Sequence, residues 1–232
     1  MLTEIIATNI EEAINAERYG ADRLELIHDF ELGGLSPQLE LARKVCAAVN
    51  IPVNVMVRPH GESFIYTPQD MTTILHEIDY LLSNTKVSSI VFGSLTEYNA
   101  INFRQLESLI KLLETTSVGL TFHRAIDVSR DVVAAYQELQ NYAPHLTRVL
   151  SSGGKDSAID GSEQLAEMQQ ASRGVILLAG AGITPDNAAD LVRITKVSEI
   201  HLGTGVRTNG KLDQSKFEIL KILIECLEKN GE

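Results

Sequence analysis

Several polar side chains stand at or just beyond the ends of short apolar segments, and their types are those of a small-molecule site. Arginines bind anions, histidines transfer protons near neutral pH, and carboxylates or hydroxyls orient both. We expect the arginines and a serine to hold an anionic ligand, the histidines to transfer protons, and the carboxylates to orient them. The candidate residues are Glu25, Arg58, His123, Arg124, Asp127, Ser151 or Ser152, and His201.

The segments that must position these side chains form one repeated unit. Apolar runs rich in Val, Ile and Leu alternate with stretches of helical period. The runs start near Leu2, Arg23, Pro52, Ser88, Val118, Thr147, Val175 and Glu199. Strand then helix, eight times in 232 residues, predicts an α/β protein, a (β/α)8 TIM barrel that forms a single domain over residues 1–232. A dinucleotide-binding sheet would need G-x-G-x-x-G after its first strand, where Ala7-Thr8-Asn9-Ile10 stands instead.

Three Ser-Pro or Thr-Pro pairs mark expected helix starts. In each pair a hydroxyl can cap the helix, and proline suits the first turn because its missing N–H has no partner there. The pairs are Ser36-Pro37, Thr67-Pro68 and Thr184-Pro185.

Alternation along the strands predicts a polar barrel interior. In the segment 53–58 the valines suit the helical shell, so Asn54, Met56 and Arg58 face inward. The same rule places Arg23, Glu25, Thr121, His123, Glu199 and His201 in the lumen. Barrel active sites lie at the carboxyl ends of the strands, so we expect the early residues Glu4, Arg23, Arg148 and Glu199 to form structural ion pairs at the opposite end. An internal ion-pair network with no ligand is the alternative for the whole set.

Two glycine-rich turns follow the seventh and eighth segments. They are Gly180-Ala181-Gly182 and Gly203-Thr204-Gly205. In this fold a phosphate often lies between these two loops, held by backbone N–H groups. Gly180, Gly182 and Gly203 are therefore predicted ligand-binding residues together with Ser152. The alternative is that both are tight turns that need positive φ.

The loop Ser151–Lys155 is expected to be mobile and able to close over a ligand. Lys155 could suggest Schiff-base chemistry, but it follows two glycines and is poorly held for the desolvation that activates a lysine amine.

The composition excludes several classes of partner. Thirty-one acidic residues against 20 basic ones give a formal charge of −11, a surface that repels phosphate backbones and anionic lipid, so neither a nucleic acid nor a membrane is an expected partner. No apolar run approaches the roughly 18 residues of a membrane span, and the start Met1-Leu2-Thr3-Glu4 lacks signal-peptide features. A cytoplasmic location is expected. Cys46 and Cys226 alone offer neither a disulfide scaffold nor a zinc site.

The same segments resemble the CutC family of copper homeostasis proteins. The matching motifs follow one another over most of the chain: Gly20–Leu26, Gly33–Pro37, Met56–Pro59, Thr121–Ala125 with Asp127, Arg148–Gly154, Gly180–Ile183 with Asn187, and Glu199–His201. The resemblance implies a (β/α)8 barrel, a cytoplasmic location and a link to copper. It also implies that Glu25, Arg58, His123, Arg124, Asp127 and His201 belong to the family's lumen cluster.

Two main functions stay open at this point, and the sequence does not settle whether the protein is an enzyme. One is an enzyme-like site for a small anionic ligand, such as a phosphorylated one, and the other is direct copper binding and trafficking. Cu(I) favours thiolate and thioether ligands, but both cysteines fall on predicted helices and Met56 offers one thioether. A set of His123, His201 and Glu25 for a divalent metal is a further option. A scaffold acting through oligomer contacts is a third function, and a homodimer is a common outcome for such chains.

Overall fold

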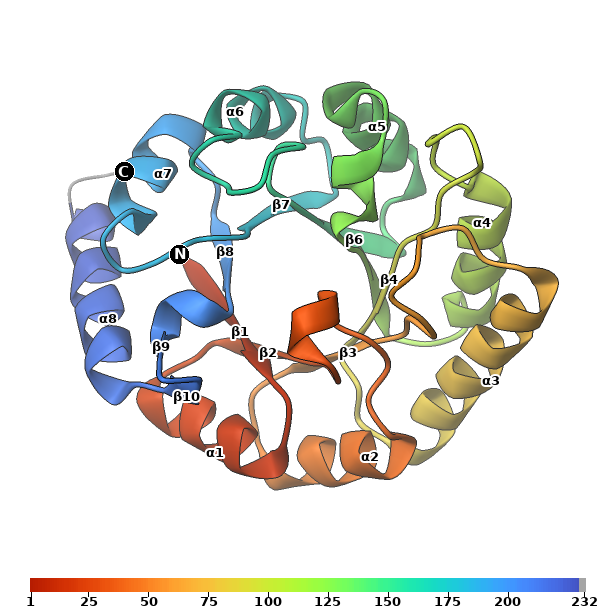
Figure 1. The fold of residues 1–232 in the computed structure, drawn as a ribbon, viewed down its shortest axis with the longest axis horizontal. Coiled ribbons are helices and arrows are strands. Elements are labelled where there is room, and N and C mark those ends of the chain that lie inside the picture. The colour runs from red at the N-terminus through yellow and green to blue at the C-terminus, as the bar shows by residue number, and fades with distance from the viewer. Residues whose placement is uncertain (230–232) are drawn as a thin grey trace.

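Eight parallel strands close into a barrel surrounded by helices (Figure 1). The computed structural model describes residues 1–229. The strands are β1 (Leu2–Ala7), β2 (Arg23–Leu26), β3 (Val53–Met56), β4 (Ser89–Phe92), β5 (Gly119–Phe122), β6 (Leu146–Ser151), β7 (Ile176–Gly180) and β8 (Glu199–Leu202). Each strand pairs with the next, and β8 pairs with β1 to close the ring. The predicted single-domain (β/α)8 barrel is confirmed.

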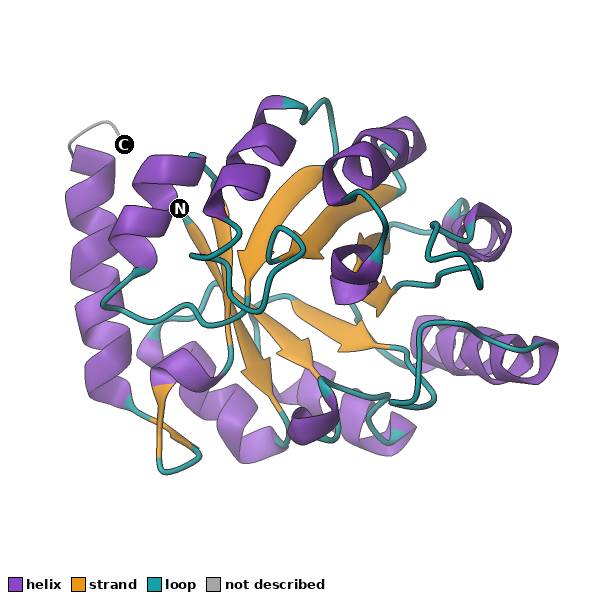
Figure 2. Cartoon of the chain, turned by 45° about the horizontal axis from the view of Figure 1, so that its top comes forward, coloured by secondary structure: helices purple, strands orange, loops and turns teal. Residues whose placement is uncertain are grey.

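The helices form the outer wall of the barrel, as the tilted view in Figure 2 shows. They are α1 (Ile10–Tyr19), α2 (Leu39–Ala48), α3 (Pro68–Asn84), α4 (Phe103–Leu113), α5 (Val132–Leu139), α6 (Ser162–Gln170), α7 (Ala188–Thr195) and α8 (Gln214–Lys229). Shorter elements are the 3-10 helices η1 (Phe30–Leu32), η2 (Arg124–Val128), η3 (Gln140–Tyr142) and η4 (Thr204–Val206), and a hairpin of β9 (Arg207–Thr208) and β10 (Lys211–Leu212). No helix within residues 1–229 is long and apolar enough to cross a membrane.

Every barrel strand begins within one residue of its expected start. The reason is that the outward side chains of the strands form a continuous core with the helices. Leu24, Leu26, Val53 and Val55, for example, are buried in this core, and burying each such side chain stabilises the fold by roughly 1.5–3 kcal/mol. The alternation that assigned them outward therefore leaves the polar residues between them to face the lumen.

Only one of the three Pro-based helix starts is confirmed. Thr67 caps α3, its hydroxyl accepting a hydrogen bond from the Asp70 N–H in a capping box. The Ser36-Pro37 prediction is wrong because α2 begins at Leu39 and the Ser36 hydroxyl donates instead to Glu77 on α3. The Thr184-Pro185 prediction is also wrong: these residues form a turn, and α7 begins at Ala188.

Candidate functional site

A cavity of about 340 Å³ opens at the carboxyl ends of the strands. This volume lies within the range of small-molecule sites, roughly 300–1,000 Å³. The predicted site residues that line it are Glu25, Arg58, His123, Arg124, His201, Gly182 and Gly203. Apolar side chains, among them Ile27, Met56 and Leu150, and the rings of Phe30 and Phe64 line the rest. The structure therefore brings most of the predicted residues together in one pocket.

Arg58, two residues after the end of β3, is a buried cation without a carboxylate partner. The residue is 6% exposed. Its Nη1 donates to the carbonyls of Leu32 (3.0 Å) and Gly34 (3.2 Å), and its Nη2 to that of Gly61 (3.3 Å). The guanidinium lies 4.6 Å from the centre of the Phe64 ring, and Nε has no hydrogen-bond partner. Burial lowers the pKa of this guanidinium, and none of the carboxylates of residues 1–229 forms an ion pair with it, so its charge is uncompensated.

His123, directly after β5, is held as a neutral imidazole. Its Nδ1 accepts a hydrogen bond from the Ala125 N–H at 3.1 Å, which leaves the ring proton on Nε2. The residue is 3% exposed, and Nε2 has no partner among the described residues. Burial, together with the charges of Arg58 and Arg124, lowers the pKa of His123 to about 3. At neutral pH the ring is therefore an uncharged hydrogen-bond donor.

Arg124 and Asp127, both in η2, hold the loop that follows β6. Arg124 Nε donates to Asp127 Oδ2 at 2.8 Å, and its Nη2 donates to Ser152 Oγ at 2.9 Å. Asp127 also accepts hydrogen bonds from the Ser151 hydroxyl (2.6 Å) and from the backbone N–H groups of Ser152 and Gly154. Arg124 lines the cavity, whereas Asp127 and Ser152 lie outside its lining. Asp127 thus orients Arg124 and shapes the loop.

Of the three glycines predicted to bind a ligand, two line the cavity and one packs inside the barrel. Gly182 and Gly203 line the cavity next to Ala181 and Thr204. Ala181 and Gly182 both have positive φ, 82° and 67°, so the turn after β7 is sharply bent where it meets the cavity. Gly180 lies outside the cavity lining, and a Cβ there would stand 2.5 Å from Leu150 Cδ1. Gly180 therefore allows close packing inside the barrel.

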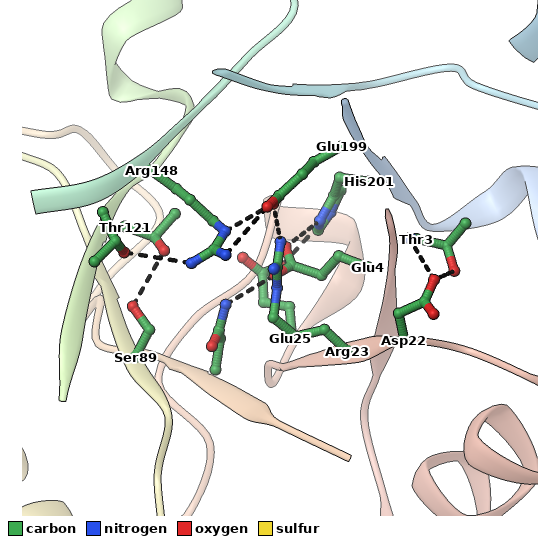
Figure 3. A network of polar contacts seen from close by, with 12 residues as sticks. Thr3, Glu4, Asp22, Arg23, Glu25, Ser89, Thr121, Arg148, Glu199 and His201 are labelled. Atoms are coloured by element: carbon green, nitrogen blue, oxygen red, sulfur yellow. Dashed lines mark hydrogen bonds and ion pairs between the residues drawn. The ribbon is translucent and has the colours of Figure 1, made fainter. Parts of the chain in front are cut away.

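Glu25 and His201 form an acid–base pair at the base of the cavity (Figure 3). His201 Nε2 lies 3.7 Å from Glu25 Oε2, and His201 Nδ1 lies 2.8 Å from Glu4 Oε1. All three residues are buried, and Glu25 Oε1 has no hydrogen-bond partner. The histidine therefore bridges two carboxylates, one that lines the cavity and one that lies below it.

The protonation states of this trio follow from burial and from its charges. Burial, reinforced by the Glu4 charge, raises the pKa of Glu25 to about 7 against the opposing effect of His201. Glu25 and Glu4 raise the pKa of His201 although burial opposes them. The hydrogen bond from His201 and the charge of Arg23 outweigh burial and lower the pKa of Glu4 to about 2. At neutral pH Glu4 is ionised and Glu25 can take or release a proton, while the raised pKa of His201 favours its protonated form.

An ion-pair network lies beneath this trio, at the amino-terminal end of the lumen (Figure 3). Arg23 donates from Nε to Glu4 Oε2 (2.5 Å) and from Nη2 to Glu199 Oε2 (2.6 Å), while Arg148 Nε donates to Glu199 Oε2 (2.7 Å). Asn54 Nδ2 donates to Glu4 Oε2 at 2.8 Å. The expected structural ion pairs between early strand residues therefore form.

Two features of the site are not predicted by the sequence. Glu4 was expected to be purely structural, yet it also bonds His201. The two residues are register partners on the neighbouring strands β1 and β8, and this register depends on the stagger of the closed barrel. Phe30, the first residue of η1, and Phe64, on the loop between β3 and α3, line the cavity from outside the strands, so no strand alternation in the sequence marks them. Each ring stacks with an arginine, Phe64 with Arg58 and Phe30 with Arg207.

The donor atoms of the site do not suit Cu(I). Within residues 1–229 the closest potential metal ligands are the side chains of Glu4, Glu25 and His201, and His123 is not part of that cluster. Two carboxylates and one imidazole are hard or borderline donors, whereas Cu(I) selects sulfur. Met56 is the sulfur-bearing side chain of the described cavity lining. Cys46 is buried in α2 and lines a separate cavity with residues that precede β3, β4 and β5, and Cys226 is exposed on α8.

Comparison with known proteins identifies the relatives of this chain. The sequence model of the CutC family matches residues 1–206. A family protein CutC of Pasteurella multocida is 38% identical over 209 residues, which cover 89% of this chain and 84% of that protein. A CutC of Streptococcus agalactiae, whose description links that protein to copper homeostasis, shares the fold with a TM-score of 0.81 at 23% identity, covering 89% of this chain and all of that one. A phosphoribosyl anthranilate isomerase of Thermococcus kodakaraensis also shares the fold, with a TM-score of 0.64 at 16% identity over 96% of this chain and 98% of that one.

Proposed function

This chain belongs to the CutC family, and we propose that it is a cytoplasmic protein that binds a small anionic ligand in the cavity at the carboxyl end of its barrel. Arg58 and Arg124 hold the anion, and the Glu25–His201 pair exchanges protons with the ligand. The link to copper homeostasis that describes the Streptococcus agalactiae protein is carried over here as a physiological role, without a copper ion bound in the cavity.

The uncompensated charge of Arg58 is the observation that carries this proposal. The other buried arginine of the lumen, Arg23, pairs with two carboxylates, whereas the Arg58 guanidinium donates to backbone carbonyls. A buried charge without an opposite charge costs several kcal/mol. An anion in the cavity removes that cost, so the pocket is complementary to a negatively charged group.

The shape of the cavity limits the size of the ligand. Its volume of about 340 Å³ fits a metabolite rather than a polymer. The rings of Phe30 and Phe64 and the side chains of Ile27, Met56 and Leu150 give it an apolar wall against which the carbon skeleton of a ligand packs. The bent turn at Ala181–Gly182 and the turn at Gly203–Thr204 present backbone to the same space, as loops that bind phosphate do in this fold.

The experiment compares wild-type protein with Arg58→Met and Arg43→Met in a thermal-shift titration with phosphorylated metabolites. Arg43 is a matched control because it is exposed on α2 and pairs with Glu40 on the same helix. We expect at least one phosphorylated compound to stabilise the wild type and Arg43→Met, by about 2.7 kcal/mol at 100 times its Kd, and to leave folded Arg58→Met unshifted. An equal shift in all three proteins would sink the assignment of Arg58.

Direct copper binding is tested on the same preparations. A copper carrier purified without oxygen and supplied with Cu(I) holds near-stoichiometric metal. The cavity proposed here holds none, because its described lining has one thioether and no thiolate. If the wild type holds stoichiometric copper and Met56→Leu loses it, the cavity is a metal site rather than an anion site.

A further inference from the structure

Resting on the anion site proposed above, we infer that the cavity removes a proton from a carbon atom next to a carbonyl group. The substrate class is an α-hydroxy aldehyde or ketone that carries an anionic group such as phosphate. Glu25 is the base, and the Nε2–H of His123 donates a hydrogen bond to the carbonyl oxygen. The arginines hold the anionic group.

The first observation is that His123 is held as a neutral imidazole that can donate a hydrogen bond from Nε2. The Ala125 N–H fixes the tautomer by donating to Nδ1, and a Cβ at Gly93 would stand 2.6 Å from that atom, so the backbone packs tightly against this side of the ring. The opposite nitrogen, Nε2, is buried and unpartnered in a residue that lines the cavity. A neutral imidazole donor stabilises the negative charge that grows on a carbonyl oxygen when a neighbouring proton leaves.

The second observation is that Glu25 is a carboxyl group placed for proton transfer rather than for an ion pair. Its Oε1 is unpartnered in a residue that is 2% exposed and lines the same cavity. The basic side chain of the described residues that lies within 4 Å of it is His201, at 3.7 Å from the other oxygen and bonded to Glu4 on its far side. Ile27 and Met56 line the same cavity, and the burial of Glu25 leaves its carboxylate poorly solvated. Such a carboxylate is a stronger base than one in water.

The third observation is that the described lining of the cavity lacks three common nucleophiles of covalent catalysis, although the Thr204 hydroxyl and the Asp156 carboxylate are part of it. Its lining, as far as the structure describes it, contains no serine, cysteine or lysine. Ser151 and Ser152 are bonded to Asp127, and Lys155 lines a different cavity beside α5 and α6. The absence of serine, cysteine and lysine from the described lining therefore favours acid–base chemistry.

The reaction balances without any further reactant. The carbon-bound proton passes to Glu25, the C–H electron pair forms a C=C bond, and the carbonyl π pair becomes a lone pair on the enolate oxygen beside His123. Return of the proton to the same carbon regenerates the substrate. Return to the neighbouring carbon, which was the carbonyl carbon of the substrate, gives the isomer: the hydroxyl proton passes to the enolate oxygen, and the carbon that carried that hydroxyl becomes the new carbonyl carbon. No oxidant or reductant is consumed.

The experiment measures solvent deuterium exchange by proton NMR. The probes are dihydroxyacetone phosphate and ribulose 5-phosphate in D2O, with binding of each probe measured separately by thermal shift. The proteins are wild type, Glu25→Gln, His123→Leu, His123→Gln and the control Glu114→Gln, whose position after α4 is exposed, each purified identically. His123→Gln is the rescue variant, because a glutamine amide N–H can occupy nearly the place of Nε2–H.

We expect the carbon-bound hydrogen of a bound probe to exchange with solvent deuterium in the presence of wild type and of Glu114→Gln. Exchange should fall at least about 100-fold in folded Glu25→Gln and in His123→Leu, with partial recovery in His123→Gln. A probe that binds without exchanging overturns this inference and leaves the anion site standing. Exchange that persists in both loss variants overturns it as well. Failure of both probes to bind the wild type counts against the anion site and the inference together.

Discussion

Replacing Glu4 with glutamine removes the negative charge around which the lumen network is built. This carboxylate is fully buried on β1 and accepts hydrogen bonds from Arg23, Asn54 and His201. Glutamine has almost the same shape but no charge, so Arg23 keeps Glu199 as its only ion-pair partner and His201 loses one of its two. The change therefore tests the electrostatics of the network with little change in packing.

The size of the effect follows from the pKa of Glu4. That pKa is about 2 in the folded protein against 4.5 for an unperturbed glutamate, and each step of one in pKa corresponds to about 1.4 kcal/mol. The ionised carboxylate therefore stabilises the folded state by about 3 kcal/mol, which agrees with the roughly 3–5 kcal/mol lost when one partner of a buried ion pair is removed. Because the pKa is lower in the folded state, this contribution is complete above about pH 4.5 and is lost as the pH falls towards 2.

The assay is equilibrium unfolding in urea of wild type, Glu4→Gln and the control Glu40→Gln at pH 7 and pH 3. Glu40 is an exposed carboxylate on α2. We expect Glu4→Gln to lose about 3 kcal/mol of unfolding free energy at pH 7 and clearly less at pH 3, while the control matches the wild type at pH 7. A loss below about 0.5 kcal/mol at pH 7, typical of a surface change, or a loss of equal size at both pH values, would refute the reasoning.

Three further predictions concern the cavity and its loop. Asp127→Asn weakens the bonds to Arg124 and Ser152 and should speed cleavage of the 151–161 loop in limited proteolysis; an unchanged rate would contradict the role of Asp127. Gly203→Ala places a Cβ 2.7 Å from Phe30 Cζ and should weaken binding of a phosphorylated ligand about tenfold or more by titration, whereas unchanged affinity would move the ligand away from this turn. Burial raises the folded-state pKa of Glu25 to about 7 from 4.5, so ionisation of Glu25 lowers the stability of the wild type as the pH rises from about 4.5 through 7. The unfolding free energy of Glu25→Gln should decline less than that of the wild type over this range. Parallel curves of unfolding free energy against pH would contradict that pKa.

The fold could be predicted because its signal is local and repeated. Each strand is a short run of Val, Ile and Leu packed against helices, so its place depends on its own residues and hardly on distant ones. Helix starts were less predictable, since the Ser36 hydroxyl can either cap a helix or bond a distant carboxylate, and in the folded chain it bonds Glu77. Tertiary contacts decide between such alternatives.

The inward-facing residues of the site were predictable from strand alternation, and their pairing was not. Alternation states that Glu25 and His201 face the lumen, whereas the stagger of the closed barrel decides that Glu4 stands opposite His201. The loops decide the rest. Arg58 is held by carbonyls of Leu32, Gly34 and Gly61, and no property of the Arg58 segment alone indicates that its charge stays without a carboxylate.

The most direct test of the anion site is the Nε–H signal of Arg58 in a nitrogen-15 NMR titration with the phosphorylated compound that stabilises the protein most. Arg58→Met assigns the signal by its loss, and exposed Arg43 supplies the internal reference. We expect a saturable change of the Arg58 signal with the same Kd as the thermal stabilisation, and no such change of the Arg43 signal. An Arg58 signal that stays fixed while the ligand saturates the protein would contradict it.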